Sequence, residues 1–438
     1  MTSRTPVYNM KIVMKETGLK ADILRAWERR YDLPHPQRTA GHQRLYSDYD
    51  IAIIKWLKGK QAEGLSISRA VQLWKELMAA GRDPLQEVTE LKTSPSLSLA
   101  GGMTIEILRQ QWLEGCLAFD AASAEEALNQ AFALYPVEIA CSAILRQGLN
   151  IIGEQWYLGN ISVQQEHFAS SLAIRRLETL LSATPQLTYL HTVLVGCPVG
   201  ELHTFPAIML SLFLQRKGMR VVYLGANNPI EQMDATIEAI HPDLVVLSAQ
   251  QLVTAASLFD AALALHERRI PLAYGGLIFN HVPGLRQRIA ATFLGESLES
   301  AVDEIAQLIQ SPAVLSPIPF DEKYRALAHR FRLSRALIEK EVYAALQKDN
   351  IQIDTIENGN TFFGTRLAAA LDLGDLVFLE SELTWVNGLL TSHHLPAEQL
   401  RSYLGTYSRC VQAVLGKGGN PITRWIDQYL SKEQQTRT

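Results

Sequence analysis

Cysteine is scarce in this chain of 438 residues, which has only Cys116, Cys141, Cys197 and Cys410 and no C-x-x-C pair. This spacing argues against a disulfide framework and a structural zinc site, and it suits a reducing compartment. Long apolar runs are missing too, since no stretch of roughly 18 apolar residues occurs and the amino-terminal segment lacks the apolar core of a signal peptide. We therefore expect a soluble, cytoplasmic protein.

A strong net charge is also absent, because the whole chain carries only −4, but the charge is unevenly distributed. Residues 1–60 hold 12 Lys and Arg against 6 Asp and Glu, a balance of +6, and the other 378 residues hold 29 against 39, a balance of −10. A basic end on an acidic body suits a DNA-binding domain, because phosphates attract it. The length predicts about three to four domains.

The run LRAWERRYDLPHPQRTAGHQRLY near the amino terminus predicts a DNA-binding surface. A short helix around residues 12–13, a turn at Gly18 and a second helix over residues 20–30 form a helix-turn-helix pattern. Arg25 and Arg29 lie four residues apart on that second helix, so both project from one face. A proline-rich loop then carries further basic and aromatic side chains. The predicted DNA-binding residues are Lys20, Arg25, Arg29, Arg30, Arg38, His42, Arg44 and Tyr46.

From about Tyr8 to Leu57 the sequence resembles the winged helix of the MerR family of transcription regulators. The resemblance implies that residues 1–80 bind double-stranded operator DNA and that the protein works as a homo-oligomer, a dimer or tetramer. The alternative is a solvated basic surface with Trp27 in a small core. The residues in the family's register are Arg25, Trp27, Glu28, Arg29, Tyr31, Pro34, Arg38, Gly41, Arg44 and Tyr46.

The rest of the chain divides into segments that differ in amino-acid composition and hydrophobic pattern. Residues 81–102 hold prolines, serines and glycines and predict a linker. Residues 103–186 are rich in Ala, Leu, Glu and Gln and predict a bundle of about four helices. Residues 187–315 alternate β-branched runs with helical segments, which favours a doubly wound parallel α/β sheet of flavodoxin-like order. The five predicted strands are Thr192–Val199, Arg220–Leu224, Leu244–Ser248, Pro271–Tyr274 and Ala291–Leu294.

Residues 316–438 predict an extra all-helical domain. Asp372–Leu390 and Gln399–Leu415 have the pattern of amphipathic helices, and Gly359–Gly364 is a possible turn between two halves. Adjacent His393 and His394 precede a proline and are more typical of a surface turn than of a metal site. We interpret this region as a domain for oligomerisation or for a second input.

Ligands of doubly wound sheets bind beyond the carboxyl ends of the strands, next to the first strand–helix loop. Here that loop spans residues 200–206 and contains Glu201 and His203. A His two residues after a Glu suits a metal ligand, because one ring nitrogen can bind while a nearby carboxylate or backbone group fixes the other. The same pattern also fits an ordinary loop histidine, so by itself it leaves both interpretations open.

This segment resembles the cobalamin-binding domain that holds its cofactor base-off, with a protein His as the lower ligand of cobalt. The resemblance implies that His203 is the metal ligand and that small residues leave room for the nucleotide tail. Pro206 departs from the glycine of the family's first motif but is tolerated at the start of a helix, and Gln250 stands where an aliphatic residue or Thr is usual. The matching residues are Glu201, His203, Ser248, Gly275 and Gly276.

The bundle segment WYLGNISVQQEHFAS, residues 156–170, resembles the cap over cobalamin in the light-sensing MerR-type repressors called the CarH group. The resemblance implies that Trp156 stacks over the upper ligand and that Glu166 and His167 approach the ribose. Tyr157 also belongs to this cofactor-binding set, but the group's photoreceptors have a His there that captures cobalt after illumination. A phenol, with an ordinary pKa of about 10, is a poor cobalt ligand. The alternative is an aromatic residue in a bundle core with an exposed Glu-His pair.

The order of winged helix, bundle and sheet resembles the CarH group over residues 8–310. It implies a non-enzymatic transcriptional repressor whose operator binding and oligomeric state are set by adenosylcobalamin and changed by light. Because Tyr157 replaces the expected His, a light-independent corrinoid or redox sensor stays open. A corrinoid methyl-transfer protein and a regulator with a degenerate pocket are further alternatives.

Overall fold

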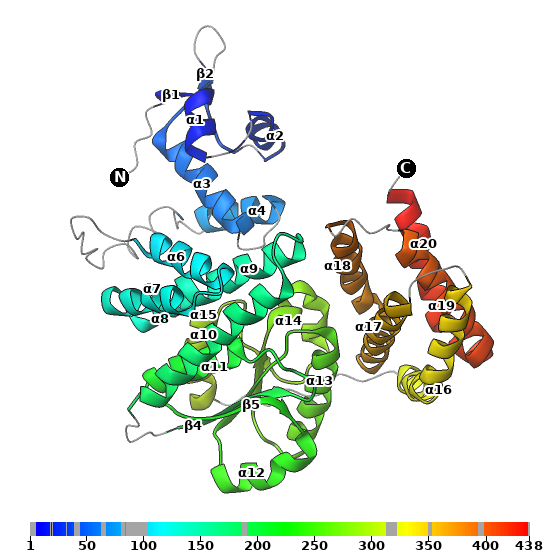
Figure 1. Ribbon diagram of the computed structural model, residues 1–438. Helices are drawn as coiled ribbons and strands as arrows, with labels where there is room; N and C mark the ends of the chain where they lie inside the picture. Colours follow the sequence, from blue (N-terminus) through cyan, green and yellow to red (C-terminus); the bar gives the residue numbers. More distant parts are fainter. Residues whose placement is uncertain are drawn as a thin grey trace. The chain divides into compact units, whose positions relative to one another are not determined.

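The computed structural model describes residues 6–17, 19, 21–31, 33–38, 44–62, 67–79, 84, 104–185, 191–311, 322–348, 353–392 and 398–436. The chain forms two compact units, Met1–Gly102 and Met103–Thr438 (Figure 1). The predicted linker lies outside the described residues, Pro84 excepted. No helix in the described part of the chain is long and apolar enough to cross a membrane.

The first unit pairs helices with a small antiparallel sheet of order β1-β3-β2. Its two consecutive amino-terminal helices confirm the predicted helix-turn-helix. Ser47 and Asp50 form reciprocal hydrogen bonds at the start of α3 (Asp48–Ala62). Asp50 also accepts from the His35 N–H at 3.2 Å, so the segment around His35 is fixed to α3. The elements are β1 (Tyr8–Asn9), α1 (Met10–Thr17), α2 (Ala21–Tyr31), β2 (Gln37–Arg38), β3 (Arg44–Tyr46), α3 (Asp48–Ala62) and α4 (Ile67–Ala79).

The second unit begins with the predicted helical bundle, which is confirmed. Thr104, Asp120 and Ser162 each cap the helix that follows them, which sets the helix starts. One rod of the bundle is interrupted by a π-helical turn, η1. The elements are α6 (Ile105–Leu117), α7 (Ala121–Leu134), α8 (Val137–Ala140), η1 (Cys141–Arg146), α9 (Gln147–Tyr157) and α10 (Val163–Ala183).

A five-stranded sheet follows, with parallel neighbours in the order β5-β4-β6-β7-β8. This is the predicted flavodoxin-like order, and its direction reverses between β4 and β6. The strands are β4 (Thr192–Pro198), β5 (Arg220–Asn228), β6 (Leu244–Ser248), β7 (Leu272–Gly275) and β8 (Thr292–Phe293). The helical segments are α11 (Phe205–Arg216), η2 (Ile230–Gln232), α12 (Met233–Ile240), α13 (Leu252–Glu267), α14 (Leu277–His281), η3 (Pro283–Gln287) and α15 (Leu298–Gln310).

Both faces of the sheet are buried, because consecutive residues of β4 point into different cores. Val193 and Val195 join a core with α11, α15 and the bundle. Leu194 joins the other core, which contains α13 and continues into the carboxyl-terminal helices. The bundle and the carboxyl-terminal helices therefore approach the sheet from different faces.

The carboxyl-terminal helices include one long helix where a turn was predicted. That prediction is wrong, because α17 (Ile353–Asp372) passes through Gly359 and Gly364 without a break. A Cβ at Gly359 would lie 3.1 Å from the Tyr403 ring, so this glycine allows close helix packing. His393 and His394 lie outside the described residues. The other elements are α16 (Glu322–Gln347), η4 (Leu376–Phe378), α18 (Leu379–Ser392), α19 (Glu398–Leu415), η5 (Gly416–Gly419) and α20 (Asn420–Thr436).

Candidate functional site

Glu201, in the loop after β4, is fully buried at the switch point of the sheet. One carboxylate oxygen, Oε1, accepts the backbone N–H of His203 at 2.9 Å and lies 2.7 Å from its Nδ1. The other, Oε2, accepts the backbone N–H of Gln250 at 2.6 Å and the hydroxyl of Thr254 at 2.7 Å. A single carboxylate thus joins the loop after β4 to the loop after β6.

These contacts set the charges of the Glu201–His203 pair. Burial alone would raise the pKa of Glu201, but the hydrogen bonds from His203, Thr254 and Gln250 outweigh it and lower the pKa. The hydrogen bond to Glu201 raises the pKa of His203 against the effect of burial, and the charges of Glu201 and Glu166 raise it further.

The imidazole of His203 is held in a definite orientation. With Nδ1 on the Glu201 carboxylate, Nε2 is left for a ligand, and 58% of the side chain is exposed. The loop itself is fixed by Asn227, whose Oδ1 accepts the Gly200 N–H at 2.9 Å and whose own N–H donates to the Glu201 carbonyl at 3.1 Å. Pro206 is the second residue of α11, close to the expected first.

Gln250 connects the ends of two further strands. Its Nε2 donates to Ser248 Oγ at 2.8 Å, and its Oε1 accepts the Leu277 N–H at 3.0 Å. Ser248, one of the predicted cofactor-binding residues, is therefore held by Gln250 at the edge of the sheet. Gln250 was noted in the sequence only as a departure, and Thr254 was missed, because both act through contacts with a residue about fifty positions away.

The two predicted glycines after β7 have different roles. A Cβ at Gly275 would meet nothing within 4 Å, so this position leaves open space at the strand end, which suits a passing ligand tail. Gly276 has φ +128°, and a Cβ there would lie 1.8 Å from the carbonyl oxygen of Ala249. Only glycine satisfies both constraints at Gly276.

We expect Gly275→Ala and Gly276→Ala to separate binding from stability. Gly276→Ala should lower the free energy of unfolding by about 2–3 kcal/mol, because it combines a strained φ with a backbone clash. Gly275→Ala should leave stability within about 0.5 kcal/mol of wild type and weaken ligand binding, since the new methyl group fills open space. Urea denaturation and ligand titration measure the two effects, and equal stability losses would contradict this assignment.

The predicted cap residues lie at the end of α9 and the first turn of α10. Glu166 Oε2 is 2.6 Å from His167 Nδ1, and the exposed His167 ring faces solvent. The half-buried Trp156 stacks against Trp385 of α18, with ring centroids 6.3 Å apart, and the Tyr157 hydroxyl donates to the Trp385 carbonyl at 3.2 Å. The contact with α18 was not foreseen from the sequence.

The donor set fits a metal that brings most of its own ligands. In the part of the chain that the structure describes, no three His, Cys, Asp or Glu side chains cluster to hold an ion. Burial raises the pKa of the Cys197 thiol to about 12, so it stays neutral. His203 thus offers one imidazole nitrogen at the edge of the sheet where Gly275 also leaves open space, and this fits the expected cobalamin, a group that carries most of its metal's ligands itself.

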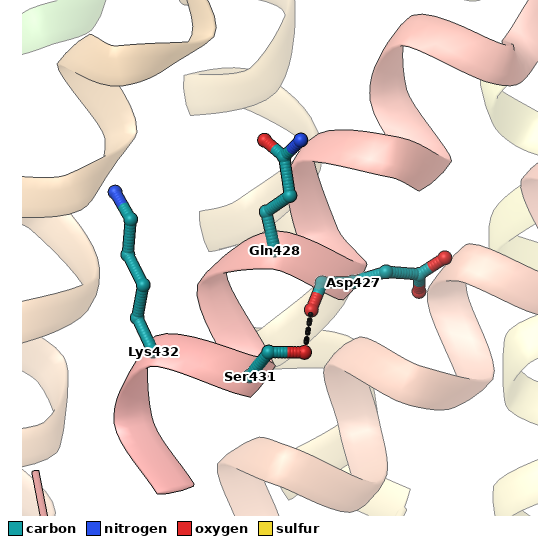
Figure 2. A pocket seen from close by; sticks show the side chains of 4 residues that line it. All are labelled: Asp427, Gln428, Ser431 and Lys432. Carbon is teal, nitrogen blue, oxygen red and sulfur yellow. Dashed lines mark hydrogen bonds between the residues drawn. The ribbon is translucent and has the colours of Figure 1, made fainter. Parts of the chain in front are cut away.

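A surface hollow in the carboxyl-terminal helices contains none of the predicted residues. Consecutive turns of α20 line it, and the Ser431 hydroxyl donates to the Asp427 carbonyl at 2.8 Å (Figure 2). The ammonium of Lys432 is paired with Glu380 at 2.9 Å. The Ser431 hydroxyl and the Lys432 ammonium are therefore already engaged, and we assign this hollow no ligand.

The predicted DNA-binding side chains fall into distinct groups. Arg25, Arg29 and Arg30 are exposed on α2, as expected for phosphate contacts. Arg44, the first residue of β3, is paired with Glu28 at 2.6 Å, so it also connects β3 to α2. Tyr46 departs from its predicted place on the surface: only 1% of it is exposed, because its ring fills the core. Lys20 and His42 lie outside the described residues, as does the side chain of Arg38.

Three family descriptions match the chain. Residues 8–77 match the MerR HTH family regulatory protein. Residues 108–181 and residues 191–305 match two families that are each described as a B12 binding domain. The matches cover the first unit, the bundle and the sheet, and they end before the carboxyl-terminal helices.

Several relatives share this arrangement in whole or part. HTH-type transcriptional repressor CarH of Myxococcus xanthus is 31% identical over 306 residues, 68% of this chain and 97% of the relative. CarA of the same organism is 28% identical over 305 residues, 68% of this chain and 95% of the relative. Trimethylamine corrinoid protein 2 of Methanosarcina acetivorans is 27% identical over 44% of this chain and 92% of the relative. Among solved structures, the monomethylamine corrinoid protein of Methanosarcina barkeri is 17% identical. The match covers 47% of this chain and 100% of that protein, with a TM-score of 0.40.

Proposed function

The chain belongs to the family of cobalamin-binding MerR-type transcriptional regulators that includes CarH and CarA, and from this premise we propose that it is a light-responsive repressor controlled by adenosylcobalamin. The observation that carries the proposal is the buried Glu201 holding His203 at the switch point of the sheet, in a chain that also has a MerR unit. The single nitrogen offered by His203 is suited to cobalt, and the three arginines of α2 are suited to DNA phosphates.

Each part of the chain contributes one task. His203 would bind the metal through Nε2, since Glu201 orients its ring through Nδ1, and Gly275 would leave room for the nucleotide tail. Trp156 and Glu166 of the bundle would cover the bound group and exclude water from it. When bound, adenosylcobalamin supplies a cobalt–carbon bond that light breaks.

DNA affinity depends on assembly in this proposal. Linked winged helices bind an operator with avidity that exceeds the affinity of one head, and that avidity disappears when the oligomer dissociates. No change within the DNA contacts is therefore required. Size-exclusion chromatography of the loaded protein before and after green illumination tests this, with a shift to smaller species expected in light and an unchanged profile contradicting light control.

We expect Arg29→Ala to weaken binding to all DNA sequences to a similar degree. If Arg29 contacts one phosphate, the slope of log affinity against log salt concentration should fall by about 0.9. Lys217→Ala is a matched control, because Lys217 is an exposed cation of the second unit, paired with Asp303. Fluorescence anisotropy at several salt concentrations measures both variants, and an unchanged slope for Arg29→Ala would remove this residue from the DNA surface.

A light-independent corrinoid sensor is the second candidate, and Tyr157 favours it. Its phenol replaces the His that captures cobalt in the related photoreceptors, and its hydroxyl already donates to the Trp385 carbonyl. Under this candidate the corrinoid-loaded protein binds DNA equally in the dark and after illumination, but differently from the corrinoid-free protein. The illumination experiment therefore separates the two candidates.

A further inference from the structure

The carboxyl-terminal helices contact the α/β part of the second unit along one side. Helix α17 packs along α13, and residues of both helices belong to one hydrophobic core. Beside this contact, the Arg288 guanidinium lies 6.0 Å from the ring centre of Phe378 and 3.8 Å from the carboxylate of Asp375. This side of the carboxyl-terminal helices is therefore anchored to the α/β domain.

A second contact joins the same helices to the bundle. Trp385 of α18 stacks against Trp156 and packs against Tyr157, with ring centroids 6.3 and 5.7 Å apart. The Tyr157 hydroxyl donates to the Trp385 carbonyl, and a Cβ at Gly388 would lie 1.8 Å from the Tyr157 Oη. Gly388 thus provides the notch into which Tyr157 fits.

Trp385 is itself supported from behind. Its ring is nearly parallel to that of Phe362, with an interplanar angle of 13° and centroids 6.4 Å apart. The Arg366 guanidinium lies 3.5 Å from the Phe362 ring centre and pairs with Glu382 at 2.5 Å, and both charged side chains are largely buried. This continuous column of rings and charges fixes the position of Trp385 on α18.

We propose that the carboxyl-terminal helices are a clamp that joins the bundle to the α/β domain, and that Trp385 is a positioning residue for Trp156 of the corrinoid cap. This inference rests on the proposed function only in assigning Trp156 to the cap. The clamp residues lie beyond residue 305, where the family matches end. The clamp gives Tyr157 the role of docking onto Gly388, a role that a His capturing cobalt would not have.

The clamp has a thermodynamic consequence for the corrinoid. The end of α9 cannot move away from α18 without separating Trp156 from Trp385 and breaking the Tyr157 hydrogen bond. Corrinoid binding that requires Trp156 in its present position is therefore favoured by the docked clamp, and bound corrinoid favours docking by the same factor. Loosening the clamp should weaken corrinoid retention.

Hydrogen exchange of the full-length, corrinoid-free chain tests the clamp directly. The reporters are the amides of Leu158 and Gly159, which close the last turn of α9. Gly388→Ala should speed their exchange by about fivefold, the effect of losing the stacking of the Trp156 and Trp385 rings. Gly405→Ala on α19, where the nearest atom to a new Cβ is 3.9 Å away, is the control and should change nothing.

A second substitution makes the result specific. Adding Tyr157→Phe to Gly388→Ala removes the clashing Oη, and the next ring atom lies 3.1 Å from the new Cβ, so much of the lost protection should return. Unchanged exchange in Gly388→Ala and in Trp385→Leu would overturn the clamp. So would faster exchange in Gly388→Ala that Tyr157→Phe does not reduce.

Corrinoid retention then tests the link to the cap. Because cobalamin would leave through the undocked state, it should leave the loaded Gly388→Ala variant about fivefold faster than it leaves wild type, in proportion to the loss of docking. Equal release rates would overturn the positioning role of Trp385. A wild-type chain that takes up no cobalamin would instead refute the proposed function, while the hydrogen-exchange result for the clamp would stand.

Discussion

Replacing His203 by alanine should abolish the histidine-ligated absorption spectrum of bound cobalamin and lower its affinity by at least about 100-fold. Changes to residues that merely orient a metal ligand already cost about 10–100-fold, and His203 is the predicted ligand itself. The substitution should leave the fold intact, because more than half of the side chain is exposed.

The matched control is His329→Ala, which removes an exposed histidine from α16. Its absorption spectrum and cobalamin affinity should equal those of wild type. Absorption titrations with adenosylcobalamin in the dark measure all three proteins. If His203→Ala binds cobalamin with an unaltered spectrum, the lower-ligand assignment is wrong.

Replacing Glu201 by glutamine should have the largest effect on stability. The carboxylate accepts from His203, Gln250 and Thr254, and an amide of the same shape turns one acceptor into a donor that faces other donors. At this fully buried position the free energy of unfolding should fall by about 3 kcal/mol. Cobalamin affinity should fall by about 10–100-fold, because the His203 ring loses its fixed orientation.

The pH dependence gives this prediction a sign. The pKa of Glu201 is lowered in the folded protein, so its stabilisation is present above the ordinary value of 4.5 and is lost as the pH falls through the lowered value. The stability gap between wild type and Glu201→Gln should therefore narrow in acid.

The control is Glu299→Gln, because Glu299 is half-exposed and its partners are Ser142 and Arg146. It should cost less than about 1 kcal/mol. Urea unfolding at neutral and acid pH measures these differences, and equal losses for the two glutamates at neutral pH would contradict the central role of Glu201.

Local patterns in the sequence were sufficient for the helix-turn-helix, the bundle and the order of the five strands. β-branched runs predicted the strands, and Glu201-x-His203 predicted a paired loop that the structure places at the switch point. Gly359 and Gly364 were misassigned to a turn, because the preference of glycine for turns is local whereas the close approach of Tyr403 is tertiary. Local patterns do not encode such contacts.

The carboxyl-terminal contact lay beyond sequence reasoning for the same reason. The hydrogen bond from Tyr157 to Trp385 joins residues 228 positions apart. Tyr46 shows a related difficulty, since an aromatic residue in a basic segment suits a DNA surface and a core equally well, and only the fold shows that it is buried.

The most direct test of the central claim, that the corrinoid controls DNA binding, is the DNA affinity of the full-length protein with and without adenosylcobalamin, measured in the dark at fixed salt. Fluorescence anisotropy on a labelled DNA duplex long enough for two winged helices should show at least about tenfold tighter binding for the loaded protein, as expected for avidity of an assembled oligomer. His203→Ala should show no difference between the two conditions. Equal affinity of wild type with and without the cofactor would contradict the account.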